Sequence, residues 1–278
     1  MGIDLRGRTI AITGASSGIG LATAIACAEA GMNVVIAARR EERLRDLARR
    51  IESSGGKAAF MVMDVIAPGD NQRLVDFAVE RFGGLYAVFS NAGYGIERRV
   101  LDYTQPELTQ LFETNFWSSL ELSRLAARFM LERNPLPNRG HILLCSSCVS
   151  KIGLPNFAAY SASKALQDHF GRAMRIELAP QGIHVSTVHP IGTRTEFFET
   201  ARERSGGRRV SLQTPDTLKQ PPETVAKAIV RCLRKPKGEV WTSFPVRAAL
   251  ALATLMPGLT DRILRNQQKD VSGSVANK

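Results

Sequence analysis

The chain has 278 residues, 44% of them hydrophobic, and a formal net charge of +11. This length and composition allow one sizeable core, so we expect one domain. A positive net charge would suit a protein that binds nucleic acid. The basic residues are dispersed among acidic ones, however, which argues against a nucleic-acid-binding protein. The longest uncharged apolar stretch, Ala248 to Thr260, contains Pro257-Gly258 and is too short for a membrane-spanning helix.

Seven apolar, β-branched runs alternate along the chain with amphipathic stretches of helical length. This alternation predicts βαβ units, whose right-handed crossovers place helices on both faces of a parallel sheet. The predicted fold class is α/β, with a single doubly wound parallel sheet of about seven strands. The predicted strands are Arg8 to Thr13, Asn33 to Ala38, Ala58 to Val65, Leu85 to Asn91, His141 to Ser146, His184 to His189 and Glu239 to Thr242.

Local signals mark several boundaries between elements. Gly31 is placed to end the helix that begins near Gly18, and Pro106 is typical of a first helical turn. The segment 196–220 has no clear period and ends before two prolines, and its length indicates a lid over a ligand. We expect residues 1–243 to form the main domain, including this lid, and residues 244–278 to form an apolar and basic C-terminal extension and tail.

The C-terminal extension has three possible roles. Its apolar residues lie between Arg247 on one side and Arg262 and Arg265 on the other. It could pack on the domain, mediate assembly or lie on a membrane surface. Packing on the domain is the favoured interpretation. Peripheral membrane contact is the less favoured one, although a short apolar segment with basic flanks can lie on lipid without spanning it.

The four cysteines, Cys27, Cys145, Cys148 and Cys232, are too few and too scattered for a disulfide framework. Cys145 and Cys148 have the spacing of redox and zinc pairs, but no second pair or nearby histidine pair completes a metal site. We therefore expect buried thiols and no metal. The first ten residues lack the apolar core of a signal peptide. Together these observations favour a cytoplasmic protein.

A glycine-rich turn follows the first predicted strand and leads into a helix. In this context glycines permit a tight turn and a close approach of backbone N–H groups to a pyrophosphate, which sits at the positive end of the helix. A purely structural bend is the alternative, but strand, turn, helix and next strand all belong to one unit. The sequence predicts a dinucleotide site of Rossmann type that includes Gly14, Ser16, Ser17, Gly18, Ile19 and Gly20.

The end of the second predicted strand selects between the two nicotinamide cofactors. An acidic residue there binds the ribose 2′-hydroxyl, whereas arginine accommodates a 2′-phosphate. This chain has Ala38-Arg39-Arg40, so Arg39 predicts NADP(H), unless it only belongs to a basic helix face. Later strands end in residues that would line the same crevice, and these are Asp64, Val65, Asn91, Ala92 and Gly93.

Tyr160 and Lys164 stand four residues apart in a stretch with good helical character. Both side chains therefore project from one helix face. A free tyrosine has a pKa of about 10, and a nearby ammonium favours the phenolate, so Lys164 would tune Tyr160. The pair alone is a frequent accident of sequence, and an exposed helix pair is the alternative.

The chain resembles the short-chain dehydrogenase/reductase family, because the glycine-rich turn, Asn91-Ala92-Gly93, Asn115, Ser147, Tyr160 and Lys164 appear in the family's order. The match covers roughly Leu5 to Thr242, and Ser147 precedes Tyr160 by 13 residues. The resemblance implies that Tyr160 donates or accepts the proton and that Ser147 stabilises the carbonyl oxygen. It also implies that Lys164 holds the ribose and activates Tyr160, and that Asn115 supports a water relay.

The stretch from Pro190 to Thr195 resembles the family's Pro-Gly segment, which lies beside the nicotinamide. The resemblance therefore adds Pro190 and Thr195 to the implied cofactor site. Ile191 stands where the family usually has glycine. Ser17 stands where many NADP-dependent relatives have a basic residue, which leaves Arg39 as the main discriminator.

The activity that this resemblance implies is NADP(H)-dependent interconversion of an alcohol and a ketone or aldehyde, as in a carbonyl reductase. We expect an apolar small-molecule carbonyl or alcohol substrate and a homodimer or homotetramer. The alternative is a non-catalytic NADP(H)-binding sensor or scaffold, whose expected mark is loss of the catalytic residues. The candidate pocket residues are Tyr94, Cys148, Pro155, Phe157 and Ile191.

Overall fold

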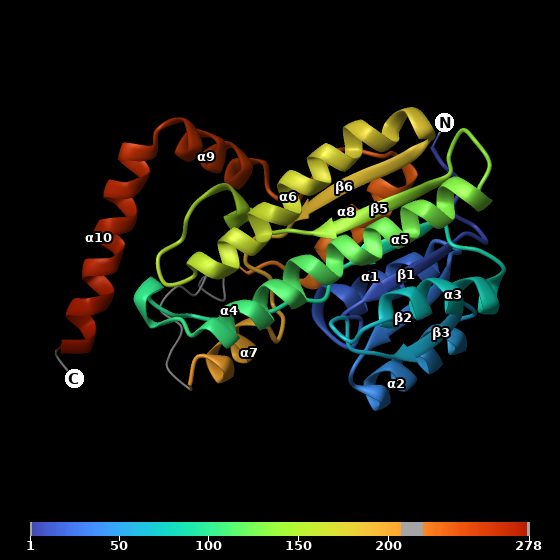
Figure 1. The fold of residues 1–278 in the computed structure, drawn as a ribbon, viewed down its shortest axis with the longest axis horizontal. Coiled ribbons are helices and arrows are strands. Elements are labelled where there is room, and N and C mark those ends of the chain that lie inside the picture. Colours follow the sequence, from blue (N-terminus) through green and yellow to red (C-terminus); the bar gives the residue numbers. More distant parts are fainter. Residues whose placement is uncertain (1, 207–218, 277–278) are drawn as a thin grey trace.

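The structure, a computed structural model, describes residues 2–206 and 219–276, and a parallel sheet forms its centre (Figure 1). The sheet has seven strands in the order β3-β2-β1-β4-β5-β6-β7, which confirms the predicted fold class. The strands are β1 (Thr9–Thr13), β2 (Asn33–Ala38), β3 (Lys57–Val62), β4 (Ala87–Ser90), β5 (Gly140–Cys145), β6 (Ile183–His189) and β7 (Glu239–Trp241).

Helices cover both faces of the sheet and bury two separate apolar cores. Side chains alternate between the faces along each strand, so Ile10 and Ile12 of β1 join one core and Ala11 joins the other. The first core lies under α1 (Gly18–Glu29), α2 (Glu41–Ser53) and α8 (Pro222–Arg234). The second lies under α3 (Asp70–Phe82), α5 (Ser118–Arg133) and α6 (Ala158–Leu178). Strands buried on both faces explain the continuous apolar runs in the sequence.

Predicted helix boundaries recur in the structure. Gly31, with a φ of +86°, follows the end of α1. Pro106 lies in the first turn of α4 (Gln105–Phe112), where Thr104 and Glu107 cap the helix reciprocally. The short elements are the 3₁₀ helices η1 (Val100–Asp102), η3 (Cys148–Lys151) and η4 (Ala179–Gln181) and the π-helix η2 (Glu113–Trp117).

One expected strand boundary is wrong, and one helix was not expected. The third strand ends at Val62 instead of Val65, because the backbone N–H of Asp64 donates to the Asp70 carboxylate as the chain turns into α3. The segment 196–220, which has no clear period in the sequence, contains a helix, α7 (Phe197–Arg204). Residues 207–218 of that lid lie outside the described residues. A helix of eight residues spans little more than two turns, too few for its period to stand out.

The chain ends in two helices that project beyond the layers of the sheet. These are α9 (Phe244–Leu255) and α10 (Pro257–Ala276), drawn in red in Figure 1, where α10 stands apart from the body. In the described part of the chain, no helix has both the length and the apolarity needed to cross a membrane.

Candidate active site

A cavity of about 560 Å³ lies at the carboxyl ends of the strands, beside the point where β1 is flanked by β2 and β4. Open α/β sheets bind ligands at such a point, because the chain departs from it in opposite directions. The cavity does not reach Gly20 or Asn115. The predicted site residues that line it are Gly14, Ser16, Ser17, Gly18, Ile19, Arg39, Asp64, Val65, Asn91, Ala92, Gly93, Ser147, Tyr160, Lys164, Pro190 and Thr195.

The glycine-rich turn is closed by contacts that leave no room for side chains. Gly14 has a φ of +64°, and a Cβ there would lie 2.9 Å from the Ala92 Cα atom. A Cβ on Gly20 would lie 2.4 Å from the Gly14 carbonyl oxygen. The Asn91 amide donates to the carbonyl oxygens of Thr13 and Gly14, at 3.0 and 3.2 Å. Gly20 therefore packs the turn from behind, and Asn91 fixes it from the side.

The turn fits the pyrophosphate of a dinucleotide. Gly18 opens α1 with a φ of +55°, and a Cβ there would meet the Thr195 methyl group at 2.9 Å. Gly18 and Ile19 at the start of this helix line the cavity, and an anion is favoured at a helix N-terminus. The close-packed turn and the helix start thus fit a dinucleotide.

The two arginines after β2 make different contacts. Arg40 donates to the hydroxyls of Ser16 and Ser17, at 2.9 and 2.8 Å, and pairs with Glu196 at 2.8 Å. Arg39 makes a 3.7 Å ion pair with Asp64, and its side chain is 65% exposed. Arg40 is thus held by the protein, while Arg39 has hydrogen-bonding capacity left for a ligand. No local pattern in the sequence indicates that Arg40 braces the turn.

Tyr160 and Lys164 lie on successive turns at the start of α6, and both line the cavity together with Ser147. Burial raises the pKa of Tyr160, and a hydrogen bond with the Ser147 side chain lowers it to a smaller extent. The phenol therefore keeps its proton near neutrality in this structure. Such a group can donate a proton to a bound oxygen.

Lys164 is buried, and its ammonium lies 5.8 Å from the centroid of the Tyr160 ring. It donates to the Cys145 carbonyl oxygen at 2.7 Å and to the Gln167 side chain at 3.1 Å. Burial lowers the pKa of Lys164. Gln167 was not among the predicted site residues, although its position three residues after Lys164 on the same helix indicates that the two side chains can meet.

Asn115 lies behind the cavity wall on the π-helix η2, and such helices are frequent at functional sites. Its amide donates to the Tyr94 carbonyl oxygen and to the Ser163 hydroxyl, at 2.9 and 3.0 Å. A Cβ on Gly93 would lie 3.0 Å from Asn115 Oδ1 and 3.3 Å from Lys164 Nζ. A side chain on Gly93 would therefore crowd Asn115 and Lys164, which would have to shift by a few tenths of an ångström.

The other end of the cavity is mostly apolar. Of the five candidate pocket residues, Tyr94, Cys148, Phe157 and Ile191 line it, whereas Pro155 does not. Among the described residues, Asn156 is the one non-glycine residue with a positive φ, so Ile191 replaces the usual glycine without left-handed strain. Val149 and Leu154, which were not among the predicted pocket residues, also line it, as do Phe197 and Phe198 of the segment 196–220.

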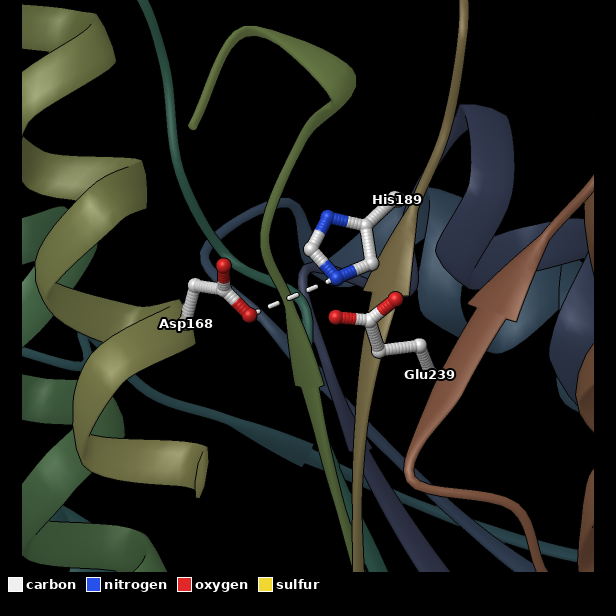
Figure 2. Close-up of side chains that lie close together, drawn as sticks. All are labelled: Asp168, His189 and Glu239. Carbon is white, nitrogen blue, oxygen red and sulfur yellow. Dashed lines mark ion pairs between the residues drawn. The ribbon is translucent and has the colours of Figure 1, made fainter. Parts of the chain in front are cut away.

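A cluster of polar side chains lies next to the cavity (Figure 2), where Asp168 of α6, His189 of β6 and Glu239 of β7 converge. Their ligand-type atoms all lie within 4.8 Å of one another, as in a metal site. The Lys151 ammonium pairs with both carboxylates, however, and so already supplies positive charge.

The His189 imidazole connects this cluster to Ser147, which follows strand β5. His189 Nδ1 lies 3.2 Å from the Ser147 carbonyl oxygen, and Nε2 lies 3.5 Å from Asp168 Oδ1. The Trp241 ring stacks on His189 with a centroid distance of 4.4 Å. We interpret the cluster as a structural tie between α6 and the ends of β5, β6 and β7.

Two protein relatives span almost the whole chain. Uncharacterized oxidoreductase YxnA of Bacillus subtilis is 30% identical over 262 residues, which cover 94% of this chain and 72% of that protein. Ketoacyl reductase HetN of Nostoc sp. is 31% identical over 267 residues, which cover 94% of this chain and 89% of that protein.

Solved structures are similar too. A short-chain type dehydrogenase/reductase from Mycobacterium marinum has a TM-score of 0.75 and 30% identity, covering 85% of this chain and 93% of that one. A short-chain dehydrogenase/reductase from Burkholderia phymatum in complex with NAD has a TM-score of 0.82 and 23% identity, and covers 93% of this chain and 96% of that one, which shows a shared fold. The family model for short chain dehydrogenase matches residues 8–206, more than half of the chain. This chain therefore belongs to the short-chain dehydrogenase family of oxidoreductases.

Proposed function

We propose that the protein is an NADP(H)-dependent oxidoreductase that interconverts an alcohol and a ketone or aldehyde, with Tyr160 as the general acid and base. The observation that carries this proposal is the placement of Tyr160, Ser147 and Lys164 on the wall of one cavity that also contains the glycine cradle. A bound nicotinamide would supply the hydride. The chain itself has to orient the substrate and move one proton.

In reduction, the Tyr160 hydroxyl would donate its proton to the substrate oxygen as negative charge develops there. Its raised pKa keeps that proton available near neutrality. The Ser147 hydroxyl would donate a hydrogen bond to the same oxygen, which is a form of oxyanion stabilisation. Lys164, fixed by the Cys145 carbonyl and Gln167, would face the ribose and stabilise the phenolate in the reverse reaction.

Cofactor choice in this proposal depends on Arg39. It lines the cavity after β2, and the position before it is Ala38, so no carboxylate competes for a 2′-hydroxyl there. Its weak pairing with Asp64 leaves the guanidinium able to bind a 2′-phosphate. The apolar wall that includes Leu154, Phe157 and Phe197 supports an apolar carbonyl substrate. A homodimer or homotetramer remains our expectation for the assembly.

The test is cofactor-dependent turnover on a panel of aliphatic, aromatic, steroid and quinone carbonyls, followed by the absorbance of the reduced nicotinamide. We expect Tyr160→Phe to lower kcat by about 10²- to 10⁴-fold, because general acid catalysis contributes that much. The matched control is Tyr103→Phe, since the Tyr103 hydroxyl donates to the Ile96 carbonyl and does not line the cavity. Full turnover in Tyr160→Phe would contradict the assignment, and NADPH binding without turnover on any substrate would favour a sensor or scaffold.

A further inference from the structure

The outward faces of α9 and α10 are apolar and exposed. Large apolar side chains follow one side of each helix, and they are between 45% and 79% exposed. Water normally faces the polar side of a helix in a globular protein, so this arrangement is inverted. The exposed residues are Phe244, Leu252 and Leu255 on α9, Met256 between the two helices, and Leu259 and Ile263 on α10.

The opposite sides of these helices are already used for packing on the protein. On α9, Val246, Leu250 and Ala253 are partly buried at helical spacing, and the Thr254 hydroxyl donates to the Lys151 carbonyl oxygen at 3.4 Å. On α10, Leu264 packs against the apolar cluster of Leu154, Phe157 and Ala201. The outward side is therefore a second apolar surface, and the fold does not cover it.

The charges on this arm have one predominant sign. Between residues 244 and 265 the sequence has three arginines, Arg247, Arg262 and Arg265, and one acidic residue, Asp261. Arg247 already pairs with Glu239 of β7 at 3.3 Å. Helical periodicity places Arg262 beside the stripe formed by Leu259 and Ile263. An apolar stripe with basic residues at its border is the pattern of a helix that lies in a lipid interface.

We propose that the outward face of α9 and α10 docks on an anionic lipid surface, with the six apolar side chains among the acyl chains and Arg262 and Arg265 at the headgroups. No described helix can span a bilayer, so the arm would lie on the membrane. The net charge of +11 adds long-range attraction to such a surface.

A second copy of the chain is the other candidate occupant, and the charges disfavour it. A closed two-fold contact brings the same face of both copies together. It would place the arginines at the border of one arm near those of the other, and like charges across an interface oppose association. Anionic headgroups complement these same arginines.

The test is sedimentation of the full-length protein with vesicles of phosphatidylcholine alone or mixed with phosphatidylglycerol. We expect binding to the mixed vesicles that weakens as salt is raised, because salt screens the arginines. The triple variant Leu252→Ser, Leu255→Ser, Leu259→Ser should lose at least about tenfold in vesicle affinity, because it removes three of the six apolar contacts. The matched control is Leu101→Ser, which changes an 86% exposed leucine of η1 and should bind like the parent.

A second variant tests the charges without altering the apolar face. Arg262→Glu with Arg265→Glu should weaken binding to the phosphatidylglycerol vesicles and leave the folding transition in place. No binding by the parent protein, or equal binding by the parent and both variants, would overturn the proposal. Self-association that rises with concentration and disappears in the triple variant, without vesicle binding, would instead identify the face as an interface between copies.

Discussion

Replacing Arg39 by alanine should reduce the affinity for NADPH and leave the affinity for NADH unchanged. A hydrogen bond to a charged group contributes about 1.5 to 3 kcal/mol. The Arg39 side chain is 65% exposed, so solvent screening lowers this value, and its 3.7 Å pair with Asp64 has to loosen. About 1 to 2 kcal/mol remains, which corresponds to a loss of roughly 5- to 30-fold in NADPH affinity.

Fluorescence titration with each reduced cofactor measures this effect directly. The matched control is Arg49→Ala, which removes an exposed arginine of α2 that pairs with Asp46 and does not line the cavity. Arg40→Ala should instead weaken both cofactors, because Arg40 braces Ser16 and Ser17 in the turn. An unchanged ratio of NADPH to NADH affinity in Arg39→Ala would refute the assignment, and a changed ratio in Arg40→Ala alone would transfer the role to that residue.

Three further predictions follow from packing and titration. Gly20→Ala should lower the free energy of unfolding by about 1 to 3 kcal/mol, measured by urea denaturation. The reason is that the new Cβ atom would meet the Gly14 carbonyl oxygen at 2.4 Å. Burial acts to raise the pKa of Asp168, but His189 and Lys151 lower it overall. The ionised Asp168 carboxylate therefore stabilises the fold above its ordinary pKa of about 4, and this contribution is lost as the pH falls below that value. Asp168→Asn should be less stable than the parent at neutral pH, and the difference should shrink in acid. Burial raises the pKa of all four thiols, those of Cys27, Cys145, Cys148 and Cys232. Their alkylation at neutral pH should therefore be slow until the protein is unfolded in urea. Rapid labelling of the folded protein would contradict this prediction.

The sheet was predictable because strands buried on both faces leave a strong signal. Each predicted run, such as Asn33 to Ala38, is continuous in apolar or β-branched residues and is followed by a helix of amphipathic character. The end of β3 was not predictable, because it depends on the Asp70 carboxylate, six residues further along the chain, which accepts a hydrogen bond from the N–H of Asp64. Short elements such as α7 lack enough turns for periodicity to distinguish them from loop.

The motif residues of the site could be placed from sequence, but their partners could not. The positions of Tyr160 and Lys164 on one helix follow from their spacing alone. That Lys164 donates to the carbonyl of Cys145 depends on how α6 lies against β5, which no local pattern contains. The same limit applies to Arg40, whose sequence position beside Arg39 gives no indication that it contacts the turn.

The position of α6 relative to the sheet is fixed by polar contacts along one side of the helix. Lys164 bonds to β5 through the Cys145 carbonyl, and one turn later Asp168 approaches His189 at the end of β6. His189 in turn lies against the carbonyl of Ser147, the residue whose side chain hydrogen-bonds with Tyr160. Because both ends of this chain of contacts carry catalytic candidates, its geometry sets the separation of Ser147 from Tyr160. Buried polar networks of this kind cost stability when incomplete, so their benefit lies in holding one arrangement of the site.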